Sequence, residues 1–167
     1  MMTKICIIFF IPFFLISCKR KNLNNEKYYS SGALKELTLS DKKLPGIKIV
    51  YSFYETGAIK EIHRYNEKNE QYGEQLWFFD NGVLDRKIPI YNDKASGNAY
   101  YFYYNNGALK NDRYFRDNKQ VFYGADYWGD SMGTMKSSLH FNDSGHIFYK
   151  KNFDESGKFI SEEGKKE

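Results

Sequence analysis

Lysine recurs at one position of this sequence, and the resulting column of cations is the first feature with chemical potential. Each of four lysines stands three residues after a glycine: Lys35, Lys60, Lys110 and Lys136. A row of ammonium groups on one surface attracts an anionic partner or a lipid head-group layer. The same row also blocks pairing between strands of neighbouring molecules, which is the commoner role of exposed lysine in sheets.

Aromatic side chains are the second candidate for binding chemistry. The 167 residues include 15 Tyr, 14 Phe and 2 Trp. We expect an aromatic stripe that contains Trp77, Tyr101, Tyr103, Tyr127 and Trp128. Large rings with a polar tip contact protein partners and stack on sugars. Packing inside the fold is the alternative use of the same rings.

The sequence lacks the patterns of common catalytic and metal sites. Around the three histidines, neither a cysteine nor an adjacent carboxylate pair completes a zinc set; they are His63, His140 and His146. No nucleophile elbow or phosphate-binding glycine loop occurs. Solvation in a turn explains the cluster of Glu67, Glu70 and Glu74. We therefore predict no enzymatic activity, no metal and no cofactor, with an envelope hydrolase that uses two carboxylates from separate strands as the remaining enzymatic hypothesis.

The elements that must position these residues follow a repeat of 25 residues. Its marker glycines are Gly32, Gly57, Gly82 and Gly107. Two aromatic residues and a polar residue precede each glycine closely, and a small and then an aliphatic residue follow in each copy. Glycine supplies the positive φ of a type I′ turn, or of a type I turn with a bulge. The pattern therefore predicts one hairpin per copy.

The pattern becomes less regular in the last third of the chain. Gly133 marks a fifth copy with one or two inserted residues, and two further turns follow at Gly145 and Gly157, 12 residues apart. Half a repeat between turns indicates two strands and two turns per unit. We expect an all-β domain over residues 28–161, a consecutive antiparallel meander of about ten strands, followed by a charged tail at 162–167.

The N-terminus has the features of an export signal. Residues 5–16 are apolar except for one proline, and 12 helical residues rise about 18 Å, too little for a bilayer core of about 30 Å. Residues 1–17 are thus predicted to be a signal peptide with a helical core. The segment Leu15-Ile16-Ser17-Cys18 resembles the bacterial lipobox. That resemblance implies cleavage before Cys18, a covalent lipid on its sulfur, and a polar tether over residues 18–27.

The repeat unit resembles the MORN-repeat variant found in YwqK-type antitoxin proteins. The shared features are paired aromatics, Asn, Ser or Thr before glycine, an aliphatic residue followed by lysine, and a trailing aromatic such as Tyr65 or Tyr114. YD repeats are the nearest rival, and the segment Phe153 to Gly157 is closer to them. The third copy departs from the pattern with Asp85 in place of lysine. The resemblance implies a non-enzymatic binding or scaffolding role, and toxin neutralisation in the antitoxin case.

Two functional hypotheses follow. The first is a lipid-anchored module that binds another protein at the cell envelope, on the periplasmic face of the outer membrane. The second is a lipoprotein that binds carbohydrate or peptidoglycan through its aromatic face. The formal net charge is +4 and charges of both signs are interspersed, so nucleic acid is not an expected partner.

Overall fold

The structure, a computed structural model, describes residues 25–41, 43–102, 106–130 and 132–165. Cys18, the predicted signal peptide and Tyr103 lie outside these residues. Lipidation and export therefore stay predictions. Among the described residues, no helix has the length and apolar character needed to cross a membrane.

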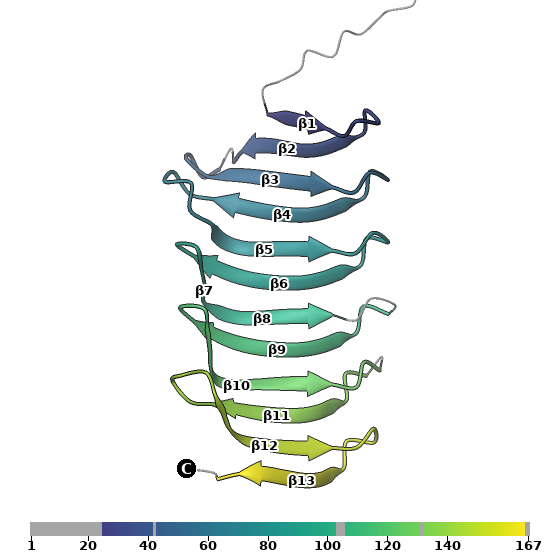
Figure 1. Cartoon of the computed structure of the whole chain (residues 1–167), viewed down its shortest axis with the longest axis vertical. Helices are drawn as coiled ribbons and strands as arrows, with labels where there is room; N and C mark the ends of the chain where they lie inside the picture. Colours follow the sequence, from purple (N-terminus) through teal and green to yellow (C-terminus); the bar gives the residue numbers. More distant parts are fainter. Residues whose placement is uncertain (1–24, 42, 103–105, 131, 166–167) are drawn as a thin grey trace, which may run out of the picture.

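The described chain is a succession of β-strands, stacked one beside the next (Figure 1). The strands are β1 (Glu26–Tyr28), β2 (Leu34–Ser40), β3 (Lys48–Phe53), β4 (Ile59–Tyr65), β5 (Tyr72–Phe78), β6 (Leu84–Tyr91), β7 (Lys94–Ala95), β8 (Gly97–Phe102), β9 (Leu109–Arg116), β10 (Lys119–Tyr127), β11 (Met135–Phe141), β12 (Ile147–Phe153) and β13 (Phe159–Gly164).

All these strands belong to one 13-stranded antiparallel sheet in which neighbours in sequence are neighbours in space. The short β7 pairs with β6 alone, and β8 takes the next place in the sheet. The predicted all-β consecutive antiparallel meander is therefore confirmed. The strands outnumber the expected ten because regular hairpins continue to residue 164 and because β7 is a separate short strand.

One long edge of the sheet, here called the repeat edge, carries the turns that the glycine spacing predicted. It lies on the right in Figure 1 and joins β1 to β2, β3 to β4, β5 to β6, β8 to β9, β10 to β11 and β12 to β13. Its glycines all have φ between 65° and 89°: Gly32, Gly57, Gly82, Gly107, Gly133 and Gly157. In the second copy, Gly57 N donates to Tyr54 O at 2.9 Å and Tyr54 N donates to Ala58 O at 2.8 Å. This is the pattern of a type I turn followed by a glycine bulge, the second of the two predicted turn types.

The placement of the last two turns corrects their interpretation. Gly157 is the sixth member of the repeat-edge column, whereas Gly145 lies at the opposite edge between β11 and β12. They are therefore the two alternating turns of one full unit. The fifth turn, at Gly133, is longer because Trp128 N reaches Thr134 O, six residues on, in agreement with the predicted insertion.

The opposite long edge, here called the variable edge, mixes a long connection, bulged turns and two-residue turns. Between β2 and β3 the connection is long, and Asp41 N donates to Ile47 O across it; residues 66–70 form a bulged turn in which Asn69 takes the glycine position with φ 66°. Two-residue turns follow at Asn92-Asp93 and Asp117-Asn118, with both residues of each at positive φ. Only residues whose side chains tolerate the left-handed region can form such tight turns.

The buried core is small and lies towards the C-terminal half of the sheet. The hydrophobic residues with the least exposure come from β8 and β10–β12: Ala99, Val121, Ala125, Leu139, Phe141 and Tyr149. No hydrophobic side chain of β1–β6 reaches the same burial among the described residues. Both faces of a single sheet share the partly covered rings, so neither face is a closed core.

Candidate binding surface

The repeat edge contains a ladder of aromatic residues, and in three of the hairpins the ladder residue bonds to the next hairpin. The Tyr29 hydroxyl donates to Phe53 O at 2.6 Å, and the Tyr54 hydroxyl donates to Phe78 O at 2.8 Å. In the fifth copy the Trp128 Nε1–H donates to Phe153 O at 3.3 Å. In each case the second aromatic of one hairpin satisfies a strand-end carbonyl of the next. Trp128 therefore belongs to this ladder.

The four predicted lysines occupy one structural position, a bulge just after each repeat-edge turn. In the second hairpin Ser52 pairs with Glu61 while Phe53 pairs with Ile59, so the register skips Lys60. The registers of the other three hairpins skip the remaining members of the column in the same way: Lys35, Lys110 and Lys136. The skipped residue is the extra residue of a β-bulge.

Three of these lysines lie against the aromatic ladder. The Nζ atoms of Lys35, Lys60 and Lys136 lie 5.6, 5.9 and 4.7 Å from the ring centroids of Tyr29, Tyr54 and Trp128. Such cation–π contacts at exposed sites contribute about 0.5–1 kcal/mol each. None of the four lysines is on β1 or β13, the outer strands, so protection of a strand edge does not explain their placement.

Trp77 and Tyr101 lie in the middle of the sheet and come together across one arginine. Arg86 pairs with Trp77 on one side and with Tyr101 on the other. The Arg86 guanidinium carbon is 4.8 Å from the Trp77 ring centroid, and His63 meets the same indole edge-on at 5.0 Å. The predicted aromatic stripe is thus split, since Trp77 and Tyr101 share a row while Trp128 lies at the repeat edge.

The one histidine of this middle row lies beside a carboxylate. His63 Nε2 lies 3.7 Å from Glu61 Oε2 and has no hydrogen-bond partner there. Burial lowers the pKa of His63, the nearby Glu61 carboxylate opposes this shift, and the Arg86 charge adds to it. For Tyr101, whose charged form is the anion, burial raises the pKa. No group of three or more metal-ligating side chains occurs in the described part of the chain.

The other two histidines lie apart from this row. His140, on β11, packs its ring against Tyr149 at 5.4 Å and Phe148 at 6.1 Å. His146 closes the turn at the end of β11, where its backbone N–H donates to the side chain of Asn142 at 2.9 Å. Ring packing and turn formation account for both positions.

An aromatic bulge in β10, at the variable edge, is the feature that sequence reasoning missed. Between β9 and β10 the register runs from Gln120–Phe115 to Gly124–Arg113, which leaves two extra residues in β10. Phe122, in this bulge, has φ 66°. The other described non-glycine residues with positive φ are all asparagine or aspartate, whose short polar side chains tolerate that region. A phenylalanine there is a backbone outlier.

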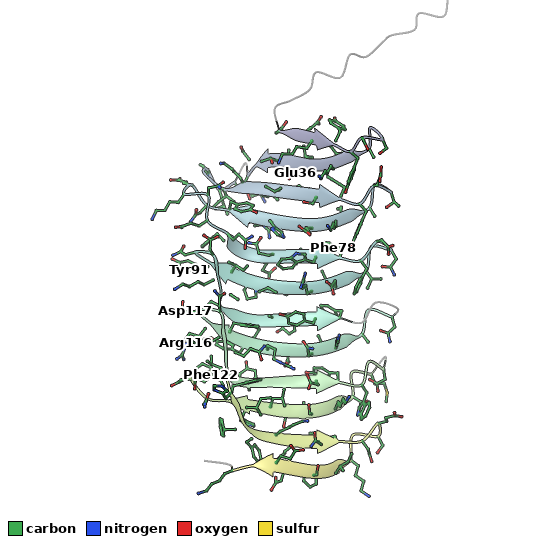
Figure 2. All side chains as sticks on the ribbon, in the orientation of Figure 1. Glu36, Phe78, Tyr91, Arg116, Asp117 and Phe122 are labelled. Atoms are coloured by element: carbon green, nitrogen blue, oxygen red, sulfur yellow. The ribbon has the colours of Figure 1, made fainter. Side chains whose placement is uncertain are left out.

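The bulge turns aromatic rings outward. Phe122 is 44% exposed and Tyr123 is 50% exposed. Both rings pack on Tyr114, with centroids at 5.5 and 6.0 Å, and the Arg116 guanidinium lies 4.5 Å from the Phe122 ring. We call these four residues the aromatic bulge surface. Figure 2 shows Arg116 and Phe122 at the same edge as Tyr91 and Asp117.

A polar network next to the bulge holds β9, β10 and β11 together. Arg113 donates to Ala125 O at 2.7 Å and forms an ion pair with Asp126. Asp126 in turn accepts a hydrogen bond from the buried Ser137 at 2.9 Å. Burial and the neighbouring Asp112 carboxylate raise the pKa of Tyr127 to about 12. The network fixes the strands, so the outward rings stand on a rigid support.

A buried glutamine performs a similar structural role between β4 and β5. These strands share only two ladder pairs, Glu61–Trp77 and Ile62–Leu76. Where the ladder stops, Gln75 accepts a hydrogen bond from Arg64 N at 2.9 Å and donates to Arg64 O at 3.2 Å. The amide side chain therefore replaces a missing pair of backbone bonds, which explains its complete burial.

Comparison with known proteins does not identify a family. No family model matches the chain, and no curated protein matches it. Among solved structures, the crystal structure of a Staphylococcus aureus TarM mutant in complex with fondaparinux, alpha-GlcNAc-glycerol and UDP is 11% identical, with a TM-score of 0.28, and the match covers 75% of this chain and 18% of that chain. A second TarM crystal structure is 12% identical, with a TM-score of 0.27, and covers 75% and 19%. The chain thus spans less than a fifth of either protein, and at these TM-scores the similarity carries no argument.

Proposed function

We propose that this protein is a lipid-anchored, non-enzymatic repeat module that binds a protein partner at the cell envelope. The aromatic bulge surface of Tyr114, Arg116, Phe122 and Tyr123 is its main contact. The sequence resemblance to the MORN-repeat variant supports a scaffold that presents a binding surface. The lipobox-like segment that ends at Cys18 supports an anchor on the periplasmic side of the outer membrane.

The observation that carries the proposal is the conformation of Phe122. A bulky residue in the left-handed region costs on the order of 1–2 kcal/mol, and strain of this kind gathers at functional sites. Here the strained residue remains 44% exposed, so a large part of its ring is available to a partner. Tyrosine and arginine, the ring's neighbours, are residue types that dominate the energetic centres of protein interfaces.

A comparison of two cross-strand neighbours tests whether the ring serves structure or binding. Phe122 pairs with Phe141, which is only 6% exposed. Truncation of a buried phenylalanine lowers the free energy of unfolding by about 3 kcal/mol or more. The Phe141→Ala variant should therefore unfold at a much lower urea concentration than the wild type. In Phe122→Gly the relief of backbone strain offsets the lost ring contacts, and we expect a change in the free energy of unfolding below about 1 kcal/mol.

The binding measurement uses the same variant in the full, membrane-anchored chain. Cross-linking in envelopes of the source bacterium should yield a defined partner with the wild type and lose most of it with Phe122→Gly. Phe159→Ala removes a ring of similar exposure at the repeat edge and should retain the partner. The resemblance to antitoxins makes a toxin encoded beside this protein the first partner to test. Equal yields from wild type and Phe122→Gly would refute the proposed contact.

A further inference from the structure

A second candidate site, this one concave, lies at the variable edge nearer the N-terminus. Three successive connections form a groove with a volume of about 380 Å³, within the roughly 300–1,000 Å³ range of small-ligand pockets. Its lining residues are Leu44, Pro45, Ile47, Asn66, Tyr72, Tyr91 and Asn92. We call this site the tyrosine groove, and the aromatic bulge surface shares none of its residues.

Two tyrosines dominate the groove. Tyr72 and Tyr91 are direct cross-strand partners at the outer ends of β5 and β6. Their ring centroids are 5.6 Å apart with an interplanar angle of 55°, so the rings form a tilted pair. They are 40% and 58% exposed. Figure 2 shows Tyr91 at this edge of the sheet.

The chemistry of the lining favours a neutral ligand that is apolar on its faces and polar at its rim. None of the lining residues carries a charge. The phenol groups of Tyr72 and Tyr91, and the side-chain amide of Asn92, make no hydrogen bond with the described part of the protein, and all three remain available. The Asn66 amide, in contrast, is occupied, because it donates to Glu70 and accepts from Lys68 N and Glu70 N.

From this combination we infer that the tyrosine groove binds an uncharged sugar unit of a glycan chain. A pyranose ring presents C–H groups on its faces and hydroxyl groups around its rim. The tilted tyrosine pair offers aromatic faces to the former, and the phenols and the Asn92 amide offer hydrogen bonds to the latter. An anionic sugar would meet no cation among the lining residues. A purely apolar peptide side chain would leave the available polar groups unused.

The turn at Asn92 supports this assignment. Asn92 and Asp93 both have positive φ, and Asp93 fixes the turn because its carboxylate accepts a hydrogen bond from Gln71 N at 2.7 Å while its N–H donates to Gln71 O at 3.2 Å. The turn is thus held by the backbone and by Asp93. The Asn92 side chain is not needed to hold the turn, and it lines the groove.

Titration calorimetry of the full chain in a detergent without sugar head groups tests the inference. The probes are chitotetraose and cellotetraose, two uncharged oligosaccharides. We expect saturable binding of at least one. Tyr91→Ala should weaken it at least about tenfold, the ratio equivalent to 1.4 kcal/mol. Asn92→Gly keeps the turn geometry and should also weaken binding, while Tyr123→Ala, with a ring of similar exposure outside the groove, should leave it unchanged.

Three results would overturn the inference: no heat of binding with either oligosaccharide, an equal loss in Tyr123→Ala, or binding of a proline-rich peptide with no binding of sugar. Thermal unfolding of each variant shows whether a loss reflects misfolding. Asn92→Gly keeps the test valid even where Tyr91→Ala unfolds. Phe122→Gly should bind the sugar as wild type does, so failure of the protein-binding proposal and failure of this one are distinguishable.

Discussion

The chain reverses direction at both long edges of the sheet, but the turns at the two edges differ. The repeat edge uses a glycine at positive φ at every turn and carries an aromatic ladder that passes from one hairpin to the next. The variable edge mixes three kinds of turn and carries the tyrosine groove and the aromatic bulge surface. Uniformity at one edge stabilises the stack. That stability leaves the other edge free to diversify, as loops on a rigid scaffold do.

The sixth hairpin lacks a ladder aromatic. In the sixth hairpin the ladder position is Asp154, whose carboxylate accepts hydrogen bonds from Ser156 N and Lys158 N within its own turn, both at 2.9 Å. This carboxylate therefore stabilises its own turn and takes no part in the ladder.

The largest difference in stability between variants of the two edges is expected at the turn residue that adopts the left-handed conformation. Outside its two chain neighbours, no atom lies within 4 Å of a Cβ built on Gly57, so backbone strain is the main expected effect of Gly57→Val. We expect a loss of about 2 kcal/mol in the free energy of unfolding. At the variable edge Asn69 has φ 66° in the equivalent position, and Asn69→Gly should change stability by less than about 0.5 kcal/mol.

Urea unfolding followed by tryptophan fluorescence measures both variants. Gly57→Asn is the matched control, because asparagine tolerates the left-handed region and should recover most of the loss. A Gly57→Val protein as stable as the wild type would mean that the repeat edge does not depend on its turn geometry.

A smaller effect is expected from single hydroxyl groups. Tyr54→Phe removes the hydrogen bond to Phe78 O and leaves that carbonyl without its donor, so we expect a loss of about 1 kcal/mol. Tyr72→Phe, at the variable edge, removes a hydroxyl that makes no hydrogen bond within the described residues and should be nearly neutral. Equal losses in the two variants, measured by urea unfolding, would remove the distinction between a stabilising edge and a binding edge.

How far the sequence predicted the fold also differs between the edges. The glycine step and the paired aromatics were sufficient for the hairpins, the meander and all six repeat-edge turns, and only the relation between the Gly145 and Gly157 turns was interpreted wrongly. The sequence also showed the lysine column, but it did not show that each lysine is the extra residue of a β-bulge. A bulge adds its extra residue in every copy, so the 25-residue spacing is unchanged and only strand pairing reveals that Lys60 is skipped.

The candidate binding residues were harder to predict because they depart from local preferences. Nothing in the propensity of phenylalanine suggests a left-handed conformation at Phe122, and that position follows from register and from the packing of β10 between β9 and β11. The tyrosine groove joins residues that are up to 48 positions apart in the chain. Such a site becomes apparent only when the pairing of Tyr72 with Tyr91 is known.

The smallest expected effect is a difference between the middle of the sheet and the repeat edge in how their local stability depends on pH. Burial holds the pKa of His63 below its ordinary value of 6.5, so the unfolded chain binds more protons near that pH. Its contribution to stability is therefore complete above about pH 6.5 and is lost as the pH falls towards the folded pKa. At the repeat edge, hydrogen bonds from Thr134 and Ser156 lower the pKa values of Asp130 and Asp154. Their contributions are present above the ordinary value of 3.8 and are lost only in more acidic solution.

Hydrogen exchange should thus show β4 and β5 losing protection first as the pH falls from 7.5 to 5.5, with the turns at Gly133 and Gly157 unchanged. In His63→Gln the first step should disappear. Simultaneous loss at both places would mean that the sheet opens as one unit, and that its middle and its edge are not energetically separate.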